Sequence, residues 1–111
     1  MRLKHTGIMG TILALWAGAP MGADVDISAA EALAKKSGCM TCHSVAQKKG
    51  APSYKSIAEK YKGKADSEAV LVKHLTTNPK VKVDGKDEEH DSLKTKNEAE
   101  VRNVTKWILS R

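Results

Sequence analysis

Two cysteines and a histidine form the most chemically specific pattern in this chain of 111 residues. Cys39, Cys42 and His43 stand in the order Cys-x-x-Cys-His, and the chain has no other cysteine. This spacing is typical of the covalent attachment of a c-type haem. One helical turn brings both sulfurs to the same side, where each forms a thioether with a haem vinyl group, and the next residue offers an imidazole to the iron. We therefore predict one covalent haem c, held by Cys39 and Cys42, with His43 as the proximal iron ligand.

Three other uses of closely spaced cysteines fit this pattern less well. A thioredoxin-like redox pair needs a βαβ context, and no strand pattern surrounds the two cysteines. A structural zinc site needs four ligands, whereas the motif supplies three, and a histidine directly after a cysteine is not the usual zinc spacing. A disulfide between cysteines this close would close too small a loop to contribute much stability.

The N-terminal segment, residues 1–23, has the composition of a secretory signal peptide. Arg2 and Lys4 give it a positive start, residues 8–17 are mostly apolar, and small residues end it. The apolar run is about half as long as a membrane span requires. We expect cleavage after Ala23 and export to the periplasm, since c-type haem is attached outside the cytoplasm in bacteria. An uncleaved N-terminal anchor is the alternative.

Residues 24–111 are expected to form one small all-α domain of about four helices around the haem. A chain of this size has a marginal hydrophobic core, so a buried cofactor is expected to supply apolar surface. Apolar periodicity and capping residues place the helices. The expected helices span residues 29–36, 54–61 and 68–76, and the last one runs from residue 96 or 98 to the C-terminus. Their expected N-cap residues are Ser28 (with Glu31 in a capping box), Ser53, either Asp66 or Ser67, and either Thr95 or Asn97.

Residues 80–96 show no clear periodicity and are rich in charge. Asp84 and Gly85 form a turn pattern inside this segment. Val81 and Val83 alternate with lysines and could form a short extended segment, but the run is too short to predict a strand. We therefore expect an irregular segment before the last helix.

With these elements placed, residues 24–111 resemble class I cytochromes c, most closely the short bacterial type. The resemblance rests on the haem motif and on the segments GAPSY (50–54), AEKY (58–61) and KWILS (106–110). It implies a small cytochrome c fold in which the first and last helices cross and the haem lies in a cleft. Pro52 matches the family proline whose carbonyl accepts a hydrogen bond from the proximal imidazole, a contact that orients the ligating histidine.

The sixth iron ligand departs from the family pattern. Such cytochromes usually place a methionine in the loop before the last helix, and this chain has no methionine after Met40. His90 lies about where that loop would place its ligand, so we predict a bis-histidine iron with His90 on the distal side. The alternatives are an open five-coordinate iron or ligation by another residue, namely His74, Lys82 or Lys86.

Ligation by His90 is expected to depend on pH. A histidine binds a metal as the neutral imidazole, so acid is expected to displace it. Acidic residues surround His90 in the sequence Asp87-Glu88-Glu89-His90-Asp91. We expect these neighbours to favour the charged, unligated form.

The excess of basic residues in the chain indicates which kind of protein partner to expect. The chain has 19 basic and 13 acidic residues, and removal of Arg2 and Lys4 leaves 17 basic residues. Many lysines flank the haem motif, and a basic rim around a haem speeds encounter with acidic partners in a salt-dependent way. We expect transient redox partners with acidic surfaces, no nucleic-acid binding, no stable membrane insertion after cleavage, and a monomer.

These features predict a soluble periplasmic one-electron carrier that shuttles between membrane redox complexes. A six-coordinate iron leaves no open position for a substrate, and no acid–base pair or nucleophile accompanies the motif, so we do not expect an enzyme. Histidine in place of methionine should lower the reduction potential, because Met/His ligation raises it. One alternative is a haem protein that binds or senses NO or CO after displacement of His90. Another is the haem subunit of a larger oxidoreductase.

Overall fold

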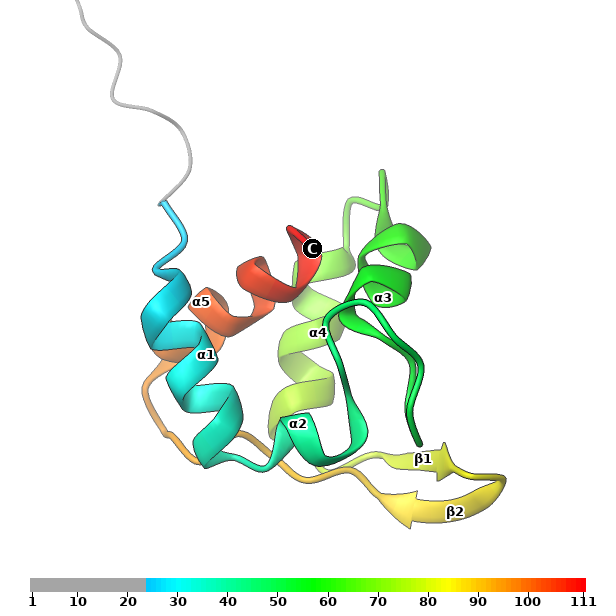
Figure 1. Ribbon diagram of the computed structural model, residues 1–111. Helices are drawn as coiled ribbons and strands as arrows, with labels where there is room; N and C mark the ends of the chain where they lie inside the picture. The colour runs from blue at the N-terminus through cyan, green and yellow to red at the C-terminus, as the bar shows by residue number, and fades with distance from the viewer. Residues whose placement is uncertain (1–23) are drawn as a thin grey trace, which may run out of the picture.

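Five helices and one two-stranded sheet make up residues 24–111, the part of the chain that the computed structural model describes. The predicted signal peptide, residues 1–23, lies outside the described residues. In chain order the elements are α1 (Ile27–Lys36), α2 (Cys39–Cys42), α3 (Tyr54–Tyr61), α4 (Ser67–Thr76), β1 (Lys80–Val83), β2 (Lys86–Glu89) and α5 (Glu98–Leu109) (Figure 1). Within residues 24–111, no helix is both long and apolar enough to cross a membrane.

The last helix, α5, is the centre of the packing, because α1, α3 and α4 all contact it. Ala30 and Ala34 of α1 are fully buried, and their small side chains let α1 approach α5 closely. The buried residues of α5 repeat at helical spacing and include Val104 and Trp107. The contact between the first and last helices is the one that the family resemblance implies.

Helix α1 begins one residue after Asp26, which is its N-cap. The Asp26 carboxylate accepts a hydrogen bond from the backbone N–H of Ala29 at 3.0 Å. Asn103 of α5 accepts a hydrogen bond from the Asp26 N–H at 2.9 Å and donates one to the Asp26 carbonyl at 2.8 Å. The predicted cap at Ser28 is therefore wrong. Aspartate is as favourable at an N-cap as serine, and the contact with α5 fixes Asp26 in that position.

The first residues of α3, α4 and α5 agree more closely with the predictions from the local sequence. Helix α3 has the predicted bounds, and the Ser53 hydroxyl accepts a hydrogen bond from the Ser56 N–H at 3.1 Å. Helix α4 begins at Ser67, directly after one of the two predicted caps. Helix α5 is capped by Asn97, whereas the hydroxyl of Thr95 binds the Glu100 carboxylate.

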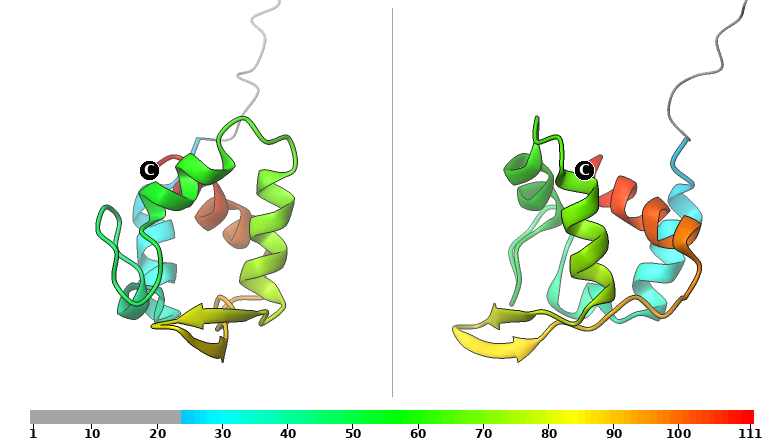
Figure 2. Two further views of the ribbon diagram at one scale, coloured as in Figure 1. Left: turned by 90° about the vertical axis from the view of Figure 1, so that its right-hand side faces the viewer. Right: turned by 180° about the vertical axis from the view of Figure 1, so that it is seen from behind.

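Strands β1 and β2 form an antiparallel hairpin where an irregular segment was expected. Asp84 and Gly85 connect the strands with φ angles of 48° and 78°, the left-handed conformation of a tight two-residue hairpin turn. Every residue of β2 is exposed, so this strand lacks the apolar alternation by which a strand is predicted. The hairpin lies on the side of the molecule away from α1 (Figure 2). The fold is thus mostly helical, with one small sheet.

Candidate haem site

A cavity of about 620 Å³ lies among α2, α3, α4 and the hairpin. Its volume is within the roughly 300–1,000 Å³ of typical ligand and cofactor pockets. All five residues predicted to hold the haem line it, together with apolar residues from four elements, α3, α4, β1 and α5. The lining includes Cys39, Cys42, His43, Pro52, Tyr54, Ile57, Leu71, His74, Leu75, Val81, Val83 and His90.

The two cysteines are the first and last residues of α2, a single helical turn. Gly38 precedes this turn with a φ angle of 77°, a left-handed conformation that suits glycine and lets the chain bend between α1 and α2. Both cysteines are half-buried. Burial raises the pKa of the Cys39 thiol above its ordinary value. Helix α2 thus presents two thiols to the cavity at the spacing that thioether attachment requires.

His43 makes the contact with Pro52 that the resemblance implies. Its Nδ1 lies 2.6 Å from the Pro52 carbonyl oxygen. A carbonyl only accepts, so Nδ1 must carry the proton and Nε2 keeps its lone pair for a metal. The Tyr54 ring stacks on the imidazole, with the ring centroids 5.1 Å apart and the planes at 18°. These two contacts fix the orientation of His43.

His90 follows β2 and faces His43. Its N–H donates to the Pro79 carbonyl at 2.8 Å, and its own carbonyl accepts from the Asn78 amide at 2.9 Å. The His43 and His90 ring centroids are 6.2 Å apart, with the planes at 54°. Metal–imidazole bonds of about 2 Å, and about 1 Å from each ligating nitrogen to its ring centre, would separate two trans imidazoles by about 6 Å. The spacing of the two rings therefore fits a single iron between them.

His74 lies on the same side of the cavity as His90. It is in the last turn of α4, and its ring centroid is 4.4 Å from that of His90, edge to face. The sequence indicated His74 as a possible iron ligand, but its place beside His90 was not predicted. The two lysines that could replace a histidine are less suited to the iron. Lys82 pairs with Asp87 at 2.6 Å, and Lys86 does not line the cavity.

Burial lowers the pKa of His90 below its ordinary value of 6.5, and the nearby His43 lowers it further. Asp91 acts in the opposite direction without reversing the shift. Asp91 thus favours the charged form, as expected of an acidic neighbour, but burial and His43 outweigh it. Burial also lowers the pKa of His74, with His90 as the next largest cause. Both side chains are neutral at pH 7, which is the form that binds a metal.

Both basic and acidic side chains line the hairpin side of the cavity. Lys82, Glu88 and Glu89 line it there, and Lys60 of α3 lines it from the other side. The predicted rim of lysines is therefore interrupted at the hairpin by carboxylates. The opening therefore has a positive charge on the α3 side and mixed charges on the hairpin side.

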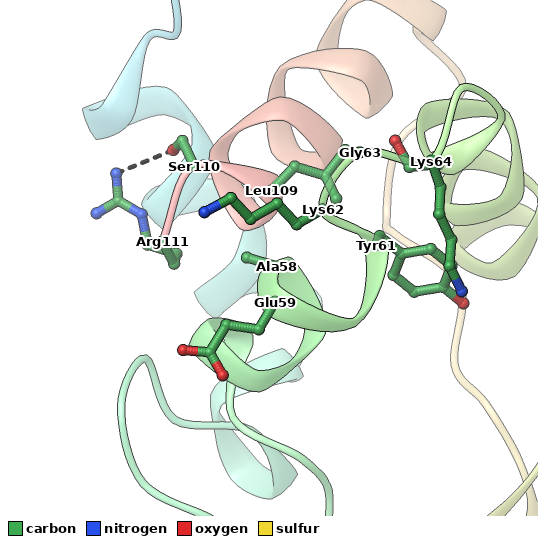
Figure 3. A pocket seen from close by; sticks show the side chains of 10 residues that line it. Ala58, Glu59, Tyr61, Lys62, Gly63, Lys64, Leu109, Ser110 and Arg111 are labelled. Carbon is green, nitrogen blue, oxygen red and sulfur yellow. Dashed lines mark hydrogen bonds between the residues drawn. The ribbon is translucent and has the colours of Figure 1, made fainter.

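A second hollow, of about 550 Å³, lies between α3, the start of α4 and the C-terminus. Figure 3 shows side chains of Tyr61, Lys62, Lys64 and Arg111 around it. It contains no cysteine or histidine and none of the predicted site residues. This hollow therefore has no role in holding the haem.

Two features of the site were not predicted from the sequence. The stacking of Tyr54 on His43 was missed, although Tyr54 follows Pro52 by only two residues. The contribution of β1 was also missed, because Val81 and Val83 were assigned to an irregular segment. The alternation of these valines with lysines could have indicated this contribution, because alternate residues of a strand lie on the same face.

Comparison with known proteins shows the family to which this chain belongs. The cytochrome c family model matches residues 27–111. The chain is 33% identical to cytochrome c-551 of Pseudomonas aeruginosa over 81 residues, which are 73% of this chain and 75% of that protein. It is 49% identical to cytochrome c-552 of Hydrogenobacter thermophilus over 37 residues, 33% of this chain and only 38% of that protein.

Solved structures show the same relationship. The class 1 cytochrome MtoD of Sideroxydans lithotrophicus ES-1 is similar with a TM-score of 0.75 and 46% identity, over 78% of this chain and 97% of that one. Cytochrome c552 of Nitrosomonas europaea has a TM-score of 0.57 and 28% identity, over 72% of this chain and 96% of that one. The chain therefore belongs to the cytochrome c family and binds one covalent c-type haem, for which Cys39 and Cys42 fit the attachment motif.

Proposed function

We propose that this cytochrome is a periplasmic one-electron carrier whose iron is held by two histidines, His43 and His90. The bound haem supplies one-electron cycling between Fe(III) and Fe(II). The observation that carries the proposal is the 6.2 Å separation of the two imidazole rings across the cavity. Two protein ligands leave no coordination position for a substrate, which fits a carrier and not an enzyme.

The two histidines are held independently of each other. Hydrogen bonding to Pro52 and stacking by Tyr54 orient His43. On the opposite side, the His90 backbone donates to the Pro79 carbonyl and accepts from the Asn78 side-chain amide. Because neither imidazole depends on the other for its position, both stay in place when the charge on the iron changes. Little reorganisation on electron transfer is what a carrier needs.

The proposed location and partners follow from composition and charge. The N-terminal 23 residues have the composition of a cleaved signal peptide. Lysines near the haem motif support transient docking to acidic redox proteins, and the carboxylates of β2 give the partner a preferred orientation. We propose that the mature protein acts as a monomer.

Spectroscopy of the haem-loaded wild-type protein tests the ligand set. We expect low-spin bis-imidazole signals in low-temperature EPR, a low-spin optical spectrum in both oxidation states, and reversible one-electron voltammetry. The reduced protein should not change its spectrum under CO. High-spin iron, or ready CO binding, would instead support a small-ligand sensor and overturn the proposal.

Export is tested separately with the full-length precursor. Expressed with a haem-attachment system, it should appear in the periplasmic fraction with the mass of a chain that begins at residue 24. A haem-loaded product that retains residues 1–23 and fractionates with the membrane would contradict the proposed location. A product that stays bound to a second subunit through purification would contradict the proposed free monomer.

A further inference from the structure

The distal wall of the cavity contains two imidazoles, although the iron needs only one there. His74 and His90 come from different elements, α4 and the end of the hairpin, and both line the cavity. We propose that His74 is a reserve iron ligand, which takes the distal position when His90 leaves it. This inference rests on the proposed bis-histidine function and extends it to a third histidine.

The distance between the two rings makes the exchange feasible. Their centroids are 4.4 Å apart, and the His74 ring meets the His90 ring at 64°, edge to face. Departure of the His90 ring leaves a space directly beside His74. Rotation of a side chain between staggered χ1 states, together with rotation about the softer χ2, moves an imidazole by several ångströms without a backbone shift. The His74 ring can therefore enter the space while α4 stays in place.

The two histidines also differ in how firmly their elements are held. Leu71 and Leu75, which flank His74 on α4, are both 6% exposed and belong to the main core. The Thr77 hydroxyl donates to the Lys73 carbonyl at 2.7 Å and secures the end of α4. The β2 strand before His90 has no buried residue. Segments with few buried contacts open most readily, so the hairpin is the element that detaches first.

A reserve ligand of the same type would protect the function of a carrier. With His74 on the iron, the haem remains six-coordinate and closed to CO and NO. The ligand pair is still two imidazoles, so the potential should change far less than on exchange with methionine. Opening of the hairpin against a docking partner would then not expose the iron to small ligands.

Three haem-loaded variants test the inference: His90→Ala, His74→Ala as the matched control, and the double variant. We expect His90→Ala to keep a low-spin bis-imidazole EPR signal with shifted g values, and to remain closed to CO when reduced. His74→Ala should keep a low-spin bis-imidazole signal, with His43 and His90 as the two ligands. The double variant should lose the low-spin signal and bind CO.

Free imidazole should restore the low-spin spectrum of the double variant, which shows that its pocket is folded. His90→Leu, which keeps the volume apolar, is the second variant if His90→Ala does not load haem. A high-spin spectrum and CO binding in the single His90 variants, equal to those of the double variant, would overturn the inference. Loss of the low-spin signal in His74→Ala alone would also overturn it. A wild-type protein without bis-imidazole signals would refute the proposed function itself, so the two failures are distinguishable.

Discussion

Trp107 offers a sharp test of how the core of this cytochrome is held together. The side chain is 1% exposed, and its indole Nε1 is buried without a hydrogen-bond partner within residues 24–111. Its ring meets the Tyr54 ring edge-on, with the centroids 5.2 Å apart. The change Trp107→Phe removes the unpaired N–H but keeps an aromatic ring in contact with Tyr54.

The expected free-energy change is the difference of two comparable effects. The smaller ring buries about 50 Å² less apolar surface, and with the small cavity left behind this costs about 1–2 kcal/mol. Removal of a buried N–H that has no partner gains about 1–3 kcal/mol. We therefore expect the effect of Trp107→Phe on the free energy of unfolding to lie between a loss of about 1 and a gain of about 2 kcal/mol, whereas Trp107→Ala should cost about 3–5 kcal/mol.

Guanidinium chloride unfolding of the haem-loaded proteins, followed by far-UV circular dichroism at pH 7, measures both changes. The haem stays covalently attached in the unfolded chain, so loss of cofactor does not complicate the comparison. A cost of about 3 kcal/mol or more for Trp107→Phe would refute the reasoning. It would mean that Nε1 is hydrogen-bonded in the loaded protein.

Three further predictions concern the helix contact, the iron and pH. Asn103→Ala should lower the free energy of unfolding by about 1–3 kcal/mol, because both hydrogen bonds to the Asp26 backbone are lost; an unchanged denaturation midpoint would show that water replaces them. His90→Met should raise the midpoint potential measured by voltammetry, because Met/His ligation raises it; an unchanged potential would remove His90 from the iron. The unfolding free energy should fall as the pH drops below about 6.5, because His74 and His90 have lowered pKa values when folded, so the unfolded chain binds more protons. Denaturation at pH 5 and pH 7 measures this slope, which should be shallower in His74→Gln; an equal slope would assign it to other groups.

The sequence was sufficient to predict those elements whose structure depends on residues close together in the chain. Helix α3 has the predicted bounds because Ser53 caps it through its own third neighbour, Ser56. The haem motif is equally local, since one turn of helix sets the spacing of the cysteines. The start of α1 was missed because its cap is selected by Asn103, which lies 77 positions away from Asp26. A contact at that separation leaves no trace in the local pattern.

The hairpin was missed for a different physical reason. Strand β2 consists of Lys86, Asp87, Glu88 and Glu89, all exposed, and contributes no apolar side chain that would reveal a strand. Its pairing depends on the left-handed turn at residues 84–85 and on the apolar face of β1. Val81 and Val83 on that face line the haem cavity, so their partner is the cofactor and not another side chain.

The position of His90 depends on the base of this hairpin more than on its tip. The His90 N–H donates to the Pro79 carbonyl. The side-chain amide of Asn78 makes two further bonds: its nitrogen donates to the His90 carbonyl, and its oxygen accepts from the Ser92 hydroxyl at 3.0 Å. Asn78 can do this because it adopts a φ angle of 51°, a conformation that asparagine tolerates better than most residues. The link between α4 and β1 therefore holds the backbone of His90, whereas His74 belongs to α4 itself. A change of ligand between these two histidines would need no movement of α4.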